Sequence, residues 1–235
     1  AGEDTDDDND SMDDDFDDCQ TGDLGWTSSS TTDYDSDGCR DAGEDTDDDN
    51  DGVADASDDC ATGDLGWTSG SSTDHDTDGC KDSTEDADDD NDGLQDASDD
   101  CPTGDLGWTS TSISDYDSDG CRNAGEDTDD DNDSILDVHD FCPQGDLGWT
   151  SSSATDHDTD GCQDSNEDAD DDNDSLQDAS DDCATGDLGW TSSSTTDHDS
   201  DGCQDSGEDT DDDNDGVADA SDGCQTGDLG WTSSS

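Results

Sequence analysis

Aspartates recur at every second position in eleven segments of this chain, with the spacing D-x-D-x-D-G-x-x-D-x-x-D/E or a close variant of it. Two of these segments run from Asp47 to Asp58 and from Asp74 to Glu85. The spacing is that of the twelve-residue EF-hand loop, in which side chains supply carboxylates and position 7 supplies a carbonyl oxygen. Because hard oxygen donors favour calcium over zinc or copper, the pattern predicts calcium sites.

Six of the segments, called first loops below, end in aspartate, whose short arm suits one-oxygen binding. Glycine at position 6 permits the sharp turn of such a loop, but Ser11, Ser134 and Ser175 replace it in three first loops. The predicted first-loop ligands are Asp6, Asp8, Asp10, Met12, Asp14, Asp17, Asp47, Asp49, Asp51, Val53, Asp55, Asp58, Asp88, Asp90, Asp92, Leu94, Asp96, Asp99, Asp129, Asp131, Asp133, Ile135, Asp137, Asp140, Asp170, Asp172, Asp174, Leu176, Asp178, Asp181, Asp211, Asp213, Asp215, Val217, Asp219 and Asp222.

The other five segments, called second loops, all keep glycine at position 6 and end in glutamate, which can supply two oxygens. One of them has Asn123 where the others have aspartate at position 9. The predicted second-loop ligands are Asp33, Asp35, Asp37, Cys39, Asp41, Glu44, Asp74, Asp76, Asp78, Cys80, Asp82, Glu85, Asp115, Asp117, Asp119, Cys121, Asn123, Glu126, Asp156, Asp158, Asp160, Cys162, Asp164, Glu167, Asp197, Asp199, Asp201, Cys203, Asp205 and Glu208.

A chain so rich in aspartate also produces D-x-D-x-D by chance, and this alternative applies to the Asp tracts of the first loops. It does not explain the second loops, whose glycine and glutamate keep the same spacing in every copy. Additional acids lie beside the loops, Asp45 and Asp48 among them. These acids allow for shared ions or for more than one ion per loop.

The loops belong to a 41-residue unit, and this repetition organises the whole chain. The copies span 1–41, 42–82, 83–123, 124–164 and 165–205, followed by a partial copy at 206–235. No copy contains an apolar helical stripe or a clear alternating strand, and turn-forming residues dominate. The sequence predicts a tandem-repeat loop array, a solenoid or rod with little regular secondary structure.

Composition explains why metal and disulfides must hold such an array together. The 235 residues include 79 acidic and 3 basic side chains, a net charge of -76, and only 21% hydrophobic residues. Composition alone is typical of disorder, because too little apolar surface is available to offset the entropy of ordering the chain. Eleven cysteines and six tryptophans at fixed intervals argue against disorder. We therefore expect a calcium- and disulfide-stabilised fold with no hydrophobic core.

The charge also restricts partners and location. Nucleic acids and anionic membranes would repel this chain, and no apolar run approaches the ~20 residues of a membrane span. The opening residues AGEDTDDDND lack the features of a signal peptide and do not begin with Met, which suggests a mature product or part of a longer chain. An extracellular or cell-surface location is expected.

The string DTDDDNDGVADASDDC at 45–60 and DDDNDGLQDASDDCP at 88–102 resemble thrombospondin type 3 repeats. The resemblance implies that calcium ions form the core, that the chain wraps around them, and that cysteines pair in sequential order. The GDLGWTSSS segment and the cysteine at position 7 of the second loops depart from that family. In these departures the unit is similar to repeats of secreted proteins of marine microbes.

Each full copy carries two cysteines, which indicates disulfides rather than a metal site because C-x-x-C pairs and histidine partners are absent. Spacing alone does not distinguish a Cys19–Cys39 pair from a Cys39–Cys60 pair, and free thiols are the remaining alternative. The family order favours the first pairing, which also closes a stretch that has no ion of its own. It gives Cys60–Cys80, Cys101–Cys121, Cys142–Cys162 and Cys183–Cys203 as further pairs and leaves Cys224 without a partner.

Several other residues allow two interpretations. The regular tryptophans could stack on sugars, but a small packing contact with a leucine such as Leu65 is favoured. The Ser/Thr runs are equally consistent with flexible linkers and with O-glycan carriers. Three N-D-S sequons, which are acceptor sequences for N-glycans, begin at Asn9, Asn132 and Asn173. The four histidines are expected to be solvated; they are His75, His139, His157 and His198.

No nucleophile–base constellation is visible, so the chain is not expected to be an enzyme. The favoured hypothesis is an extracellular structural protein, a calcium-rigidified rod or filament in which further copies of the same chain are partners. The alternatives are an acidic protein that stores calcium or nucleates mineral, and the spacer stalk of a larger adhesin.

Overall fold

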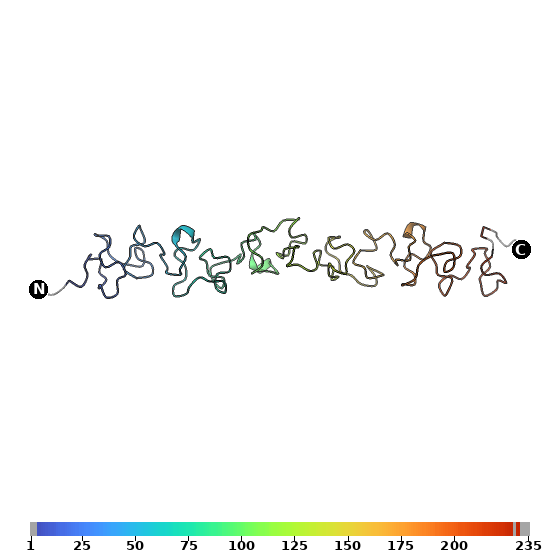
Figure 1. The fold of residues 1–235 in the computed structure, drawn as a ribbon, viewed down its shortest axis with the longest axis horizontal. Coiled ribbons are helices and arrows are strands. Elements are labelled where there is room, and N and C mark those ends of the chain that lie inside the picture. Colours follow the sequence, from blue (N-terminus) through green and yellow to red (C-terminus); the bar gives the residue numbers. More distant parts are fainter. Residues whose placement is uncertain (1–3, 228, 231–235) are drawn as a thin grey trace. The chain divides into compact units, whose positions relative to one another are not determined.

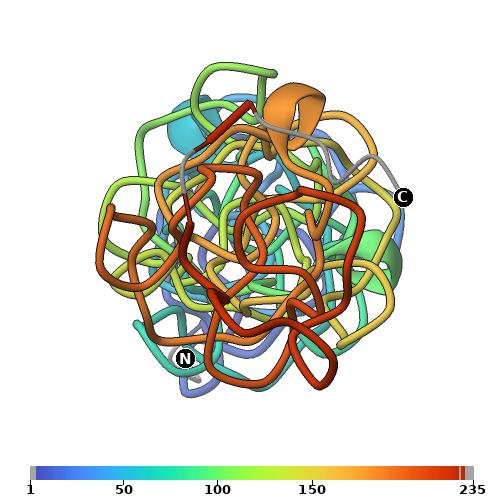
Figure 2. The ribbon, with the colours of Figure 1, turned by 90° about the vertical axis from the view of Figure 1, so that its right-hand side faces the viewer.

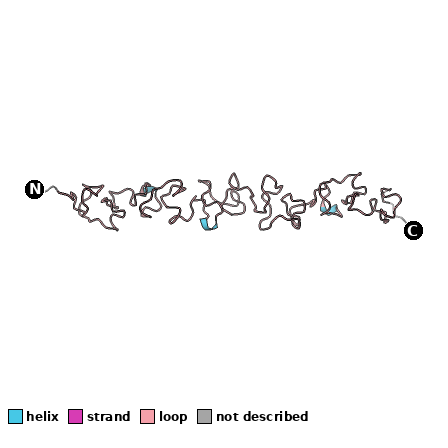
Figure 3. Ribbon diagram, turned by 90° about the horizontal axis from the view of Figure 1, so that it is seen from below, coloured by secondary structure: helices cyan, strands magenta, loops and turns pink. Residues whose placement is uncertain are grey.

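The computed structural model describes residues 4–227 and 229–230, and nearly all of them lie in turns, bends and loops (Figure 1). The described part contains three one-turn 3-10 helices, η1 (Asp55–Ser57), η2 (Asp96–Ser98) and η3 (Asp178–Ser180), and no strand (Figures 2 and 3). The prediction of little regular secondary structure is thereby confirmed. Among these residues no helix is long and apolar enough to cross a bilayer.

The chain divides into two compact units, Ala1–Arg122 and Asn123–Ser235. Each unit repeats the same order of parts, namely a first loop, a connecting segment (59–73 and its equivalents) and a second loop. The division lies beside the end of the third sequence repeat. The last tryptophan, Trp231, lies outside the described residues.

Aspartate side chains build each loop by bonding to the backbone two residues further on. In one first loop, Asp49 Oδ1 accepts the Asp51 N–H at 3.2 Å and Asp51 Oδ1 accepts the Val53 N–H at 2.7 Å. Asn50 and Gly52 adopt positive φ angles of 57° and 100°, which reverse the chain between these bonds. Short polar side chains that bond to nearby backbone compete with helix formation, so the sequence coils into a loop.

Serine keeps this geometry where it replaces the loop glycine. Ser11, Ser134 and Ser175 have φ angles of 86°, 84° and 83°. A residue with a Cβ atom is strained in this left-handed region by about 1–2 kcal/mol. The first loops thus retain one backbone conformation even where the residue disfavours it, which indicates that the surrounding contacts determine it.

Carboxylates occupy the interior where an ordinary domain has apolar side chains. The largest fully buried side chains are all aspartates, among them Asp10, Asp33, Asp51 and Asp74, each 0% exposed. The buried apolar residues of the described part are five cysteines, whereas leucines such as Leu65 are half exposed. The expected absence of a hydrophobic core therefore agrees with the described residues, and the interior needs positive charge to be stable.

Five disulfides follow the sequential pairing that the family resemblance implied. They are regularly spaced, each joining cysteines 20 residues apart: Cys19–Cys39, Cys60–Cys80, Cys101–Cys121, Cys142–Cys162 and Cys183–Cys203. Each bond connects the residues after a first loop to position 7 of the following second loop. Cys224 is free and exposed.

Replacing Cys101 and Cys121 together by serine is expected to loosen copy 3 and to leave remote copies ordered in calcium. Closing a loop of this length stabilises by roughly 3 kcal/mol, and repeat arrays couple mainly to their neighbours. Limited proteolysis followed by peptide mapping measures this, with the wild-type chain as control. Cleavage spread evenly along the chain, or no new cleavage, would contradict the local role of the disulfide.

Candidate metal centres

The first-loop aspartates converge on one point. Carboxylate oxygens of Asp47, Asp49 and Asp51 lie within 4.8 Å of one another, and the second and third of these residues are almost fully buried. Burial, followed by repulsion from Asp49, Asp51 and Asp47, raises the pKa of Asp58 to about 6. The carboxylate at position 12 is therefore near the other three. The structure thus brings positions 1, 3, 5 and 12 of the first loop together, as the EF-hand spacing predicts.

The second loop forms a matching group with a different fourth member. Carboxylate oxygens of Asp74, Asp76 and Asp78 lie within 4.8 Å of one another. Burial, then repulsion by Asp78 and by Asp86, raises the pKa of Asp76 to about 6. Asp86 is the residue after the loop's terminal Glu85, and it was not among the predicted ligands. The signal for it was present in the sequence, because every second loop is followed by an aspartate at this position.

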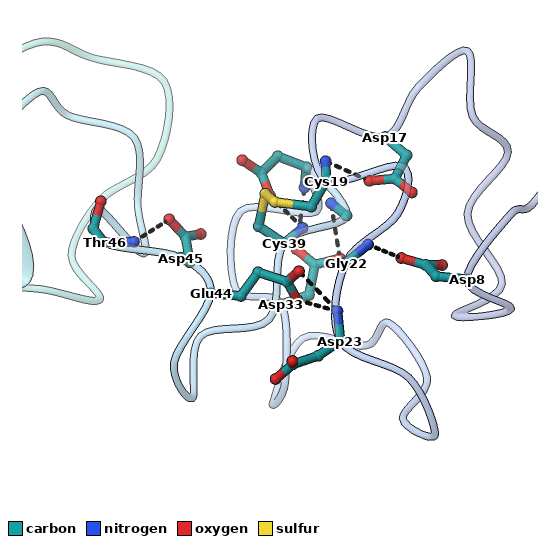
Figure 4. The surroundings of a disulfide bond; sticks show 12 residues. Asp8, Asp17, Cys19, Gly22, Asp23, Asp33, Cys39, Glu44, Asp45 and Thr46 are labelled. Carbon is teal, nitrogen blue, oxygen red and sulfur yellow. Dashed lines mark hydrogen bonds between the residues drawn. A yellow bond between two sulfur atoms is a disulfide. The ribbon is translucent and has the colours of Figure 1, made fainter.

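The terminal glutamate of the second loop also contacts the connecting segment of the preceding copy. Glu85 Oε1 accepts the Asp64 N–H at 2.6 Å, and the Glu44 carboxylate accepts the N–H of Asp23 in copy 1 at 2.8 and 3.0 Å (Figure 4). The neighbouring glycine, Gly63, donates to Asp49 Oδ2 at 2.7 Å. The glutamates that were predicted to close the second loops therefore anchor the Gly-Asp turn beside a first loop.

The connecting segment bonds to both loops of its copy, and the two loops also meet at Gly79. The Asp59 N–H donates to the Asp78 carbonyl at 2.8 Å, and the Ser69 N–H donates to the Asp51 carbonyl at 2.8 Å. A Cβ atom built on Gly79 would lie 2.2 Å from Asp58 Oδ1, so only glycine leaves room for this carboxylate. The glycine of the second loop thus serves the first loop as well as its own turn.

The position-9 aspartates point toward backbone at the start of their own loops. Asp55 Oδ1 accepts the Asp48 N–H and Asp82 Oδ1 accepts the His75 N–H, both at 2.9 Å. Among the described residues, the position-7 carbonyl oxygens of Val53 and Cys80 accept no hydrogen bond. These carbonyl oxygens are therefore available as ligands, in the role that the loop spacing gives them.

Orphaned oxygens show that the groups fit a cation. Asp47 Oδ1, Asp51 Oδ2 and Asp58 Oδ2 are buried and have no hydrogen-bond partner, and equivalent atoms recur in the other described first loops. A buried carboxylate oxygen without a partner is costly, and nearly all buried polar atoms in folded proteins are paired. A hard divalent cation would satisfy several of these oxygens at once. The chemistry of the donor set therefore matches an oxygen-preferring metal ion.

The prediction that the histidines are solvated is wrong for three of the four. His75, His157 and His198 are half-buried, and their Nε2 atoms lie 2.9–3.0 Å from the carbonyl oxygens of glycines 29 residues ahead. Tyr34 holds the same loop position and donates its hydroxyl to the Gly63 carbonyl at 2.9 Å. Sequence spacing could not show this link because the partner lies in the next copy. His139 is exposed, as expected.

Two further side chains have roles that the sequence left open. Trp67 is half-buried, and the Lys81 ammonium lies 5.9 Å from the centre of its ring, while Leu65 is half exposed. The amide of Asn173, which begins a sequon, donates to Asp158 and, at 3.3 Å, to Asp160. That amide is therefore engaged in contacts with the preceding second loop.

In a chelator, the metal-free chain is expected to be compact near pH 4 and to expand as the pH rises to 8. The pKa values of Asp58 and Asp140 are raised, first by burial and then by neighbouring carboxylates, to about 6 and about 7. The folded form thus binds more protons than the unfolded chain between the ordinary value of 3.8 and about 7, so its stability falls through that window. Hydrodynamic radius measured against pH tests this. A constant radius would contradict it, and the calcium-loaded chain at pH 8 is the compact control.

No protein-family model matches the chain, and no curated protein matches it in sequence.

Proposed function

We propose that this chain is an extracellular structural protein, a rod or filament that calcium makes rigid. The observation that carries the proposal is the identity of the buried side chains, since the largest fully buried ones are all aspartates. Carboxylate oxygens at three positions of a loop lie within 4.8 Å of one another in first loops such as Asp6, Asp8 and Asp10, and in second loops such as Asp33, Asp35 and Asp37. At neutral pH, where the carboxylates are ionised, such an interior is stable only when cations neutralise it.

Calcium is the ion that the donor set favours. The groups contain carboxylates and available carbonyl oxygens, and no histidine nitrogen or thiolate is placed among the loop carboxylates described above. Calcium accepts six to eight oxygen ligands in flexible geometry, whereas magnesium demands a near-ideal octahedron and keeps its water. Loops that offer a backbone carbonyl oxygen and a fourth carboxylate beside the convergent three fit the larger ion better.

A structural role is supported by contacts that repeat from one copy to the next. The carbonyl of Gly63 accepts from Tyr34, and Asp64 donates to Glu85, so one glycine-aspartate turn joins the copy before it and the copy after it. Asn50 donates to Asp37 of the preceding second loop at 3.3 Å. A protein that only stores calcium has no need for fixed links of this kind.

Five disulfides are typical of proteins in oxidising compartments, and they support the proposal that the rod lies outside the cytosol. The same pairing is difficult to reconcile with a cytosolic buffer, because thiols there are kept reduced. A catalytic role has no support from the site, which presents aspartates held in loop geometry and no activated nucleophile. The function is therefore proposed to be mechanical and not enzymatic.

Electron microscopy of the native particle in calcium, and after exchange into a chelator, tests the proposal. A uniform fibre in calcium that is lost in the chelator is the expected result, with magnesium at equal concentration as the control. Compact single particles in calcium would overturn the structural role and favour the storage or mineral-nucleating alternative. Fibres that persist unchanged in the chelator would overturn the role of calcium.

A further inference from the structure

A third group of carboxylates lies where one copy meets the next. It is separate from the triads at positions 1, 3 and 5 of the loops. In its first occurrence, carboxylate oxygens of Asp41, Asp45 and Asp48 lie within 4.8 Å of one another. The first belongs to position 9 of a second loop, the next follows that loop, and the last lies at position 2 of the next first loop. We call this set, with Asp55, the junction cluster.

The fourth carboxylate comes from position 9 of the following first loop. Asp55 Oδ1 accepts the Asp48 N–H at 2.9 Å, which holds the Asp55 carboxylate against the other three residues. The position-9 aspartates of both loop types therefore meet at the junction.

The same four positions come together in later copies. Asp96 Oδ1 accepts the Asp89 N–H at 3.0 Å, as Asp55 Oδ1 accepts the Asp48 N–H in the first cluster. The equivalent bonds in later copies, from Asp171 to Asp178 and from Asp212 to Asp219, are 2.9 and 3.1 Å long. The three later clusters are Asp82, Asp86, Asp89 and Asp96; Asp164, Asp168, Asp171 and Asp178; and Asp205, Asp209, Asp212 and Asp219. The arrangement is thus built by the repeat and is not an accident of one copy.

Buried oxygens without a partner point into the cluster. Asp89 and Asp171 are each only 9% exposed, and Asp212 is 8% exposed. Their Oδ1 atoms have no hydrogen-bond partner, and neither have the buried Oδ2 atoms of Asp86 and Asp168. Orphaned, buried carboxylate oxygens on two residues of the same cluster require a positive charge nearby when the carboxylates are ionised.

The chain itself offers no positive side chain for these clusters. Its three basic residues, Arg40, Lys81 and Arg122, form ion pairs with aspartates of the connecting segments at 3.7, 3.8 and 3.6 Å. Four carboxylates at one junction therefore need an external cation. Carboxylate oxygen as the only donor type selects a hard divalent ion.

We propose that each junction cluster binds a further calcium ion, separate from the ions of the first and second loops, and that this ion joins successive copies. The inference rests on the proposed calcium-dependent function and adds a site to it. It also reassigns the position-9 aspartates, such as Asp82 and Asp96, from the twelve-residue loops to the junction. An ion held by residues of two copies would resist bending between them.

Native mass spectrometry of the full chain in calcium counts the ions and tests this site. Asp89→Ala removes a junction carboxylate that belongs to no loop triad. The variant chain is expected to bind one calcium ion fewer than the wild type. Asp100→Ala is the matched control, because it removes the same charge from an exposed residue and should leave the count unchanged. An unchanged count for Asp89→Ala would overturn the proposal.

If Asp89→Ala loses several ions at once, the substitution has disrupted the whole copy. A second variant, designed to strengthen calcium binding at a junction, then tests the proposal. Asn123 occupies the position of Asp82 at the next junction. Asn123→Asp is expected to tighten one calcium ion in a titration, and an unchanged titration would overturn the proposal. A wild-type chain that binds no calcium would instead overturn the proposed function itself, so the two failures are distinguishable.

Discussion

Excess EDTA at pH 8 is expected to unfold the calcium-loaded chain completely, even with its five disulfides intact. The buried carboxylates are held close together, as in the pair Asp51 and Asp74, which are both fully buried and whose charges repel each other. Without cations, repulsion among groups a few ångströms apart in a low-dielectric interior outweighs the few hydrogen bonds that hold the loops. Metal binding and folding are therefore expected to be one process.

Hydrodynamic radius and circular dichroism, measured in calcium and then in EDTA, test this expectation. The matched control is the same addition of EDTA with excess calcium restored, which should return both signals to their starting values. A chain reduced at the same time should expand further, because each disulfide limits the expansion of one copy. An unchanged radius in EDTA would show that something other than metal supports the fold.

Much of this architecture is predictable from sequence because its causes are local. An alternation such as Asp47, Asp49 and Asp51 places three carboxylates on one side of a coiled loop whatever surrounds it. The absence of apolar periodicity likewise predicts the absence of regular helices and strands, and three one-turn helices are what the described residues contain. The disulfide pairing was available only through resemblance, since spacing left two pairings open.

Contacts between copies were not predictable, because they depend on how the loops pack. Nothing in the spacing shows that Glu85 accepts a hydrogen bond from the Asp64 N–H, or that Asp86 lies near Asp76 and Asp78. The same is true of His75, whose partner lies 29 residues ahead. A loop motif specifies where the oxygens lie around one ion. It does not specify which residues of neighbouring copies bond to that loop.

Gly79→Ala is expected to disrupt two calcium loops with a single methyl group. Gly79 has a φ angle of 89°, so the added Cβ atom strains its own loop by about 1–2 kcal/mol. The same atom would lie 2.2 Å from Asp58 Oδ1 and 2.4 Å from Asp58 Cγ, so the carboxylate that completes the first loop must move. Because Asp58 is only 9% exposed, it has little room to do so.

Alanine substitutions at two other glycines of the same copy are controls that distinguish backbone strain from the displacement of Asp58. Gly66 has a φ angle of 81° with nothing within 4 Å of an added Cβ atom, so Gly66→Ala should show the strain alone. Gly70 has open space and no positive φ angle, so Gly70→Ala should be close to wild type. In a calcium titration followed by Trp67 fluorescence, we expect Gly79→Ala to weaken binding at least about tenfold, or ~1.4 kcal/mol, beyond the effect of Gly66→Ala. Equal effects of Gly79→Ala and Gly66→Ala would show that Asp58 is not a ligand, because its displacement would then cost nothing beyond the backbone strain.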